Sequence, residues 1–204
     1  MTAAHRSIAG WLVLGLASLG LWGCSTMKPE DFADRTPSFA LEEYFDGDTR
    51  AWGIFEDRFG RLRREFVVDI TGQWQPELQT LTLDESFRYS DGERDRRVWT
   101  LRKVDDHAWE GTAADVIGKS DARVYGNALN MTYTLALKVG ERTWNVRFDD
   151  WMWRLDEDVV VNRARVSKFG IEIGEVTLFF RKLGTAADGS AQVEKPPALR
   201  QAAE

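Results

Sequence analysis

Charged side chains recur on strand faces that are otherwise apolar. Alternate residues of a β-strand point the same way, so Asp150 in the run RFDDWMWRLDED shares a face with Phe148 and Met152. The same pattern places Glu85, Arg97 and Arg163 on apolar strand faces, and Glu175 lies at the expected bulge of the last strand. An unpaired charge in an apolar interior costs several kcal/mol. We therefore expect these groups to pair with one another or to meet a polar group of a ligand.

Three kinds of chemistry fit such a cluster. The first is a set of structural ion pairs. The second is a binding site in which Arg97 or Arg163 holds the carboxylate or phosphate of an amphiphile, with its tail against aromatic side chains. The third is catalysis by Asp150 or Glu85 as a base whose pKa is raised by desolvation. The predicted ligand-binding residues are Asp150, Arg163, Arg97, Glu85, Trp99, Trp144 and Phe148.

The composition argues against several other kinds of site. The chain has 1 cysteine and 2 histidines, too few for a Cys/His metal cluster, and we expect no metal and no cofactor. Its net charge of −6 argues against a nucleic acid as partner, because phosphate binding uses clustered Lys and Arg. We assign no catalytic residue and expect a binding protein rather than an enzyme.

Strands of alternating polarity must position these side chains. The segment NMTYTLALKV has Met131, Tyr133 and Leu135 on one face and polar residues on the other, which is typical of a half-buried antiparallel strand. The expected strands lie near 39–45, 51–58, 62–74, 77–89, 95–104, 108–116, 120–127, 130–139, 142–153, 158–167 and 170–182, one of the first two being irregular. Consecutive strands avoid bare edges by closing, so we predict an all-β, antiparallel, up-and-down barrel of about 8–10 strands.

The last expected strand contains a change of phase. In FGIEIGEVTLFFRK the apolar face passes from Ile173 to Val176, and Gly174 stands between them. This pattern predicts a β-bulge that bends the strand where the barrel closes.

Two tryptophans of the DDWMW run fall on the face opposite Asp150. Trp151 and Trp153 therefore point out of the predicted barrel. Packing under a neighbouring segment, contact with a membrane interface and stacking on a sugar are the alternatives for such a pair. Packing is the interpretation we favour.

The N-terminal segment resembles a lipoprotein export signal. Residues 1–23 have a short basic start and an apolar stretch, as signal peptides do. The following LWGC resembles the bacterial lipobox, although Trp22 stands where that pattern prefers a small residue. Cys24 is thus the expected lipidation site, and its acyl chains would anchor the protein to a membrane. Ser25 rather than Asp after the cysteine favours the periplasmic face of the outer membrane.

The composition divides the chain into four parts. The signal peptide covers 1–23, the lipidated cysteine and its tether 24–37, the barrel 38–183, and a disordered C-terminal tail 184–204. The tail is assigned as disordered because it lacks aromatic residues and apolar periodicity.

The chain resembles a family of proteobacterial lipoproteins that is known only as a domain of unknown function. The stretches that carry the resemblance are FALEEYFDG, AWGIFEDRFG, GNALNMTYTL, FDDWMW, NRARVSKFG and GEVTLFFRK. Met131 stands in the third stretch where an aromatic residue would be expected. The resemblance implies a lipocalin-like barrel and brings no activity with it.

These observations favour a membrane-anchored lipoprotein that binds a fatty acid, another lipid or a hydrophobic ligand in the periplasm. One alternative is an envelope structural or assembly protein that acts through its outer surface, for which Trp151 and Trp153 are the motivation. The other is an enzyme on a lipid-like substrate. A hollow barrel favours the ligand, and a barrel filled by side chains favours the outer surface.

Overall fold

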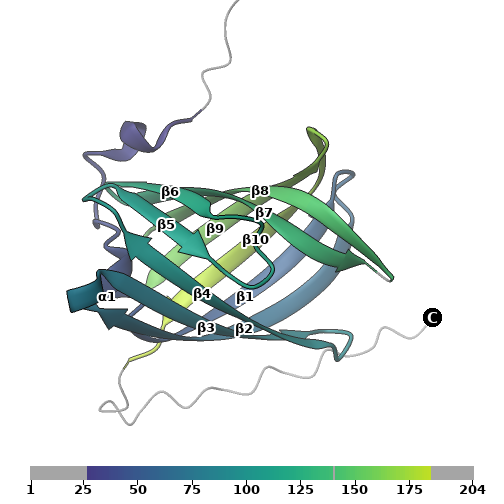
Figure 1. Cartoon of the computed structure of the whole chain (residues 1–204), viewed down its shortest axis with the longest axis horizontal. Helices are drawn as coiled ribbons and strands as arrows, with labels where there is room; N and C mark the ends of the chain where they lie inside the picture. Colours follow the sequence, from purple (N-terminus) through teal and green to yellow (C-terminus); the bar gives the residue numbers. More distant parts are fainter. Residues whose placement is uncertain (1–26, 140, 185–204) are drawn as a thin grey trace, which may run out of the picture.

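Ten strands form a closed barrel in the computed structural model, which describes residues 27–139 and 141–184. Each strand is antiparallel to its neighbours in the chain, and β1 pairs with β10 to complete the ring (Figure 1). The predicted all-β, up-and-down barrel is therefore confirmed. The elements are η1 (Pro29–Phe32), α1 (Leu41–Tyr44), β1 (Gly47–Asp57), β2 (Leu62–Gln75), η2 (Pro76–Leu78), β3 (Thr80–Tyr89), β4 (Arg94–Lys103), β5 (Ala108–Thr112), β6 (Ser120–Tyr125), β7 (Ala128–Val139), β8 (Arg142–Arg154), β9 (Val159–Lys168) and β10 (Ile171–Lys182).

The predicted bulge lies next to the seam between β1 and β10. The pairing of β10 with β9 shifts register between Glu172 and Gly174, and the residues facing the interior pass from Ile173 to Val176 across the shift. A side chain at the bulge would not fit, because a Cβ on Gly174 would lie 2.4 Å from the carbonyl oxygen of Glu56. Glycine therefore lets the two strands approach where the ring closes.

The wall departs from a regular ladder between β4 and β7. β5 and β6 are short strands of 5 and 6 residues, and β4 pairs with β5 only from Thr100 to Lys103. The loop 113–119 continues the wall beyond them. It forms a bridge to Leu135, and its Asp115 carbonyl accepts a hydrogen bond of 2.8 Å from the backbone of β7.

A short N-terminal segment closes one end of the barrel. Its apolar side chains are 1–3% exposed: Phe39, Leu41, Tyr44 and Phe45. The Phe39 N–H donates to the Gly126 carbonyl at 2.8 Å, and the Tyr44 hydroxyl donates to the Asp158 carbonyl at 3.0 Å. These two bonds join the segment 39–45, which we call the plug, to the β6–β7 turn and the β8–β9 turn. This segment is the irregular one of the first two expected strands. It includes helix α1 because its apolar residues at spacings of three and four make one helical face.

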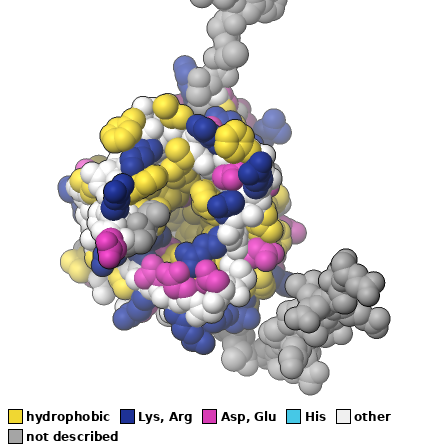
Figure 2. Space-filling model, turned by 90° about the vertical axis from the view of Figure 1, so that its right-hand side faces the viewer, with side chains coloured by type: hydrophobic (Ala, Val, Ile, Leu, Met, Phe, Trp, Pro, Cys, Tyr) yellow, Lys and Arg dark blue, Asp and Glu magenta, His cyan; other side chains and the backbone are white. Residues whose placement is uncertain are grey.

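The opposite end of the barrel is open. The turns that join β1 to β2, β3 to β4 and β9 to β10 lie there, together with the end of the β7–β8 hairpin (Figure 1). Figure 2 looks onto this end and shows hydrophobic side chains inside a hollow, with basic and acidic side chains around its rim. The interior is therefore reached from the end that the plug does not cover.

The contact between β2 and the plug gives a test of this arrangement. A Cβ on Gly72 would lie 1.7 Å from the carbonyl oxygen of Phe45, so Gly72→Ala must displace the backbone of the plug. We expect it to lower the free energy of unfolding by about 1–3 kcal/mol, as overpacking does. Urea denaturation followed by tryptophan fluorescence measures this, with Gln73→Ala on the outer face of the same strand as the control. Equal effects of the two changes would contradict the proposed contact.

Candidate functional site

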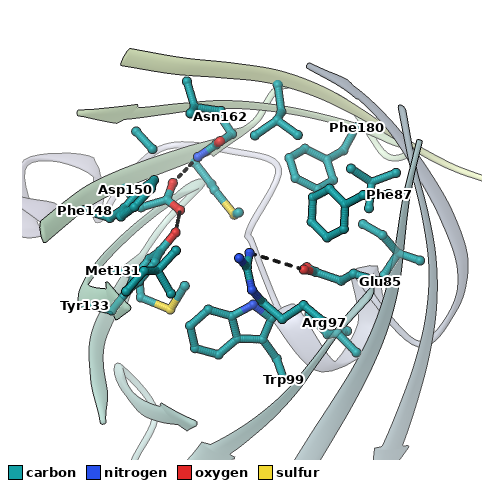
Figure 3. A pocket seen from close by; sticks show the side chains of 18 of the residues that line it. Glu85, Phe87, Arg97, Trp99, Met131, Tyr133, Phe148, Asp150, Asn162 and Phe180 are labelled. Atoms are coloured by element: carbon teal, nitrogen blue, oxygen red, sulfur yellow. Dashed lines mark hydrogen bonds and ion pairs between the residues drawn. The ribbon is translucent and has the colours of Figure 1, made fainter. Parts of the chain in front are cut away.

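The barrel contains a cavity of about 280 Å³. Phe45 of the plug lines its inner end, and Tyr89 and Ile173 line it on strands that lead to the open end. Most of the other lining side chains are aliphatic or aromatic, and charged or amide side chains interrupt this surface at a few points. Most of these polar groups fall into two clusters on facing walls (Figure 3), while Arg64 lines the cavity apart from both and pairs with Asp91 at 3.0 Å.

The first cluster contains Glu85 and Arg97, which lie directly opposite each other on β3 and β4. Arg97 points into the cavity (Figure 3), and its Nη1 is 4.0 Å from Glu85 Oε2. The other side of its guanidinium binds the carboxylate of Asp115, with Nε to Oδ2 at 3.0 Å and Nη2 to Oδ2 at 2.8 Å. Arg97 thus links the cavity to the loop 113–119, and its Nη1 is left with a contact longer than a hydrogen bond.

The second cluster centres on Asp150 of β8. The Tyr133 hydroxyl donates to its Oδ2 at 3.2 Å, and the Asn162 amide donates to its Oδ1. The same amide nitrogen donates to the Trp151 carbonyl at 2.9 Å. The amide oxygen of Asn162 is buried and has no hydrogen-bond partner within the described part of the chain.

Burial governs the protonation of both acids. Desolvation raises the pKa of Glu85 to about 7, although the nearby Arg97 opposes the shift. Desolvation also raises the pKa of Asp150 to about 6, against the hydrogen bonds from Asn162 and Tyr133. For Arg97 burial disfavours the charge, but the hydrogen bonds to Asp115 and the charge of Glu85 outweigh it and raise its pKa. The cavity therefore holds a permanent cation beside an acid that titrates near neutral pH.

Aromatic rings form the wall between the two clusters. Trp99 meets Tyr133 edge-on with ring centres 5.3 Å apart, and Tyr133 stacks on Phe148 at 5.0 Å. Such contacts fix the ring positions, and the Tyr133 hydroxyl is thereby held against Asp150.

Five of the seven predicted ligand-binding residues line the cavity: Asp150, Arg97, Glu85, Trp99 and Phe148. Trp144 does not. It packs at the edge of the core, and the Lys168 ammonium lies 3.3 Å from the centre of its ring. The ligand-binding role of the five remains a prediction, while their common position inside the barrel is a structural fact.

The expected position of Arg163 was wrong. Its side chain is 44% exposed, pairs with Glu175 at 3.8 Å and lies over the outer face of Trp153 at 5.8 Å. Neither residue of this pair joins the interior cluster, and Asp150 is bound by Tyr133 and Asn162 instead of an arginine. The phase of β9 was misread because the run VVV is apolar on both faces and defines no phase.

Four polar residues that line the cavity or bind its polar groups were not predicted: Arg64, Asp115, Tyr133 and Asn162. Ala164 and Val166 follow Asn162 at alternate positions and are buried, and this later part of the strand would have placed Asn162 inside. The alternation in NMTYTLALKV predicts an inward Tyr133 but gives no partner for its hydroxyl. Asp115 lies in a loop, where no periodicity points to a partner.

The outer tryptophans are partly covered by the N-terminal segment. Phe32 of η1 contacts Trp151 with ring centres 5.9 Å apart, and Trp151 stacks on Trp153 at the same distance. Trp151 is buried, so packing under a neighbouring segment accounts for it. This removes one of the two residues that motivated a function of the outer surface.

Two further findings concern the described residues alone. Between 27 and 184, leaving out 140, no group of three or more His, Cys, Asp or Glu is arranged to hold a metal ion. In the same part of the chain, no helix has the length and apolar character needed to span a membrane. The predicted signal peptide, Cys24 and nearly all of the predicted tail lie outside the described residues.

Comparisons with known proteins support the fold. The model of a family described as protein of unknown function (DUF3833) matches residues 18–182, whereas a search of curated proteins gives no match. A protein of unknown function from the DUF3598 family of Nostoc punctiforme superposes with a TM-score of 0.55 at 12% identity, over 72% of this chain and 51% of that one. The present chain thus spans about half the length of that protein. An S-type phycobiliprotein lyase from Guillardia theta gives a TM-score of 0.49 at 10% identity, over 78% of this chain and 100% of that one.

The raised pKa of Glu85 predicts a dependence of stability on pH. The folded state holds a proton that the unfolded state releases above its ordinary pKa of 4.5. The contribution of Glu85 to stability should therefore be fully present below that value and be lost as the pH rises towards about 7. We expect Glu85→Gln to remove part of this fall in the free energy of unfolding, on the order of 2 kcal/mol. The remaining fall would come from Asp150, whose pKa is also raised.

Urea denaturation at about pH 5 and about pH 8 measures the effect. The exposed Glu77→Gln on η2 is the matched control and should keep the dependence of the wild type. A Glu85→Gln variant whose stability falls as steeply as that of the wild type would exclude a raised pKa at this position.

Proposed function

This chain belongs to the DUF3833 family of proteins of unknown function, and we propose that it binds a single-chain amphiphile with an acidic head group inside its barrel. The observation that carries the proposal is the apolar cavity of about 280 Å³ into which the Arg97 guanidinium projects. A barrel whose interior serves only as a core would fill this space with side chains. The remaining volume supports a ligand over a purely architectural role.

The size of the cavity favours one acyl chain. Its volume of about 280 Å³ lies just below the range of ~300–1,000 Å³ for small-molecule pockets. Two-chain lipids need more room than this. Each methylene buried against the apolar lining contributes ~0.8 kcal/mol. An acyl chain of medium length therefore gains enough free energy from burial to bind in the cavity.

The first polar cluster supports an acidic head group. Nε and Nη2 of Arg97 are held by Asp115, while Nη1 lies 4.0 Å from Glu85 and remains available. A ligand carboxylate next to Nη1 would accept a charge-assisted hydrogen bond. Glu85 in its protonated form would donate a second one, and its raised pKa keeps this form populated near pH 7. An ionised Glu85 would repel the same head group.

Catalysis has weaker support from the same groups. Asp150 already accepts hydrogen bonds from Tyr133 and Asn162, which hold it in place and leave it poorly placed to take a proton from a ligand. Neither polar cluster contains a serine, cysteine or histidine that would serve as a nucleophile or its base. A binding role for the cavity needs none of these groups.

Arg97→Gln tests the head-group contact. It should weaken binding of dodecanoate by about 10-fold to 100-fold, because a hydrogen bond to a charged group contributes ~1.5–3 kcal/mol. Binding of dodecanol, which has the same chain and no charge, should change little. Displacement of anilinonaphthalene sulfonate fluorescence measures both affinities.

Arg163→Gln is the matched control, since this arginine lies on the outer face of the barrel. It should bind both compounds like the wild type. Ala164→Phe, which fills the cavity from β9, should abolish binding of both. The proposal fails if the wild type binds neither compound, or if Arg97→Gln weakens dodecanoate and dodecanol equally.

We further propose that Cys24 carries the lipid anchor and that the barrel is held at the periplasmic face of the outer membrane. The support is the LWGC pattern with the single cysteine of the chain and the Ser25 that follows it. The tether would join the barrel at the plugged end, because η1 contacts β6 and β7 near the Gly126 turn.

Metabolic labelling with radioactive palmitate tests the anchor. The wild type should incorporate label and sediment with outer-membrane vesicles, and Cys24→Ser should lose the label. Incorporation of label into Cys24→Ser would rule out the cysteine as the modified residue. Sedimentation of the labelled wild type with the inner membrane would contradict the proposed location.

A further inference from the structure

Two neighbouring hairpins at the open end carry large apolar side chains into solvent. Phe59 in the β1–β2 turn is 69% exposed and Phe169 in the β9–β10 turn is 93% exposed, with Leu62 and Ile171 beside them also exposed. The hairpins touch, because the Arg58 N–H donates to the Ile173 carbonyl at 3.1 Å. We call these residues, 58–62 and 168–171, the rim patch.

The backbone conformation at Phe169 disfavours phenylalanine, so the needs of the turn do not explain why this residue occurs here. It adopts a φ of 52° and is followed by Gly170 with a φ of 78°, which is the pattern of turns that favour Asn, Asp or Gly at both positions. A bulky residue in the left-handed region costs ~1–2 kcal/mol. A nearly fully exposed phenylalanine recovers none of this by packing, so its presence points to a role outside the fold.

Basic side chains surround the exposed rings. The guanidinium carbons of Arg58 and Arg61 lie 4.8 and 5.9 Å from the centre of the Phe59 ring, and the Lys168 ammonium lies 5.3 Å from that of Phe169. Two acids border the rim patch: Asp57, which accepts hydrogen bonds from two backbone N–H groups of the β1–β2 turn, and the exposed Glu172, which follows Ile171. The rim patch itself contains three basic residues and no acid. The patch is therefore basic in a chain whose net charge is −6.

We propose that the rim patch docks on the surface of a membrane that contains anionic lipids. Exposed Phe and Leu side chains that stand next to basic residues bury themselves at the boundary between head groups and acyl chains, and each Lys or Arg near an anionic surface contributes ~1 kcal/mol. Arg58, Arg61 and Lys168 provide that charge next to Phe59 and Phe169. A second copy of the chain is a poor occupant, because facing patches would bring like charges together.

Docking in this way directs the mouth of the cavity at a bilayer that faces the end opposite the plug, and therefore at a membrane other than the one that would hold the proposed Cys24 anchor. Figure 2 shows the hollow opening at the end where the β1–β2 and β9–β10 turns of the rim patch lie, with basic and acidic side chains around it. Where the proposed binding of an amphiphile holds, the patch would let that molecule pass between membrane and barrel without crossing water. The docking itself rests only on the rim patch and does not require a ligand.

A polarity-sensitive probe on the full chain tests the docking. Cys24→Ser leaves no other thiol, and Phe169→Cys or Leu78→Cys then receives a nitrobenzoxadiazole label. Leu78 is the matched control, since it is 65% exposed in the η2 turn at the plugged end. The probe reports its own surroundings, so the result does not depend on which other segment binds the vesicle.

We expect the probe at position 169 to gain several-fold in fluorescence with vesicles of phosphatidylcholine and phosphatidylglycerol, and much less with phosphatidylcholine alone. The probe at position 78 should not respond. Arg58→Glu combined with Arg61→Glu should reduce the gain to that with neutral vesicles, whereas Arg165→Glu on the outer wall should not. Thermal unfolding of each variant checks that the barrel is intact.

Three outcomes would overturn the proposal. They are a gain at position 78 without one at 169, an equal gain with neutral and anionic vesicles, and a concentration-dependent gain without vesicles, which would indicate self-association. Dodecanoate binding by the labelled chains, measured without vesicles, separates a failure of docking from a failure of the ligand site.

Discussion

The burial of the Arg97 guanidinium is the constraint on which the polar part of this structure depends. A cation inside an apolar barrel must be neutralised, and Asp115 does this through the loop 113–119. The same contact holds that loop in the wall between β4 and β7, where β5 and β6 are too short to continue the ladder. One ion pair therefore both balances the interior charge and ties to β4 a loop whose backbone is hydrogen-bonded to β7.

A second consequence of this pairing is that the two acids near Arg97, Asp115 and Glu85, make contacts of different length with its guanidinium. Asp115 takes the bidentate contact, so Glu85 is left with a distance of 4.0 Å to the guanidinium. Its burial is then only partly compensated, and its pKa rises to about 7. Near neutral pH Glu85 is then partly protonated and places a neutral donor beside a cation in an apolar cavity, the pair on which the proposed binding of an acidic head group rests.

The sequence predicted the parts of the fold that depend on local alternation and failed where alternation is ambiguous. The inward positions of Glu85, Arg97 and Asp150 followed from the apolar residues on either side of them, and the bulge at Gly174 followed from a change of phase. The VVV run of β9 is apolar on both faces, which led to the wrong face for Arg163. The partnership of Arg97 with Asp115 joins a strand to a loop, and such a contact is set by closure of the barrel rather than by any local pattern.

The plug closes one end of the cavity, and this closure affects how fast a bound molecule could be exchanged. A molecule inside cannot be pushed out by another that arrives from behind, because Phe39, Tyr44 and Phe45 fill that end. Entry and departure along the barrel axis share a single mouth, so an occupant must leave before its successor can enter. Exchange would then proceed at the rate of departure, however high the concentration of the incoming molecule.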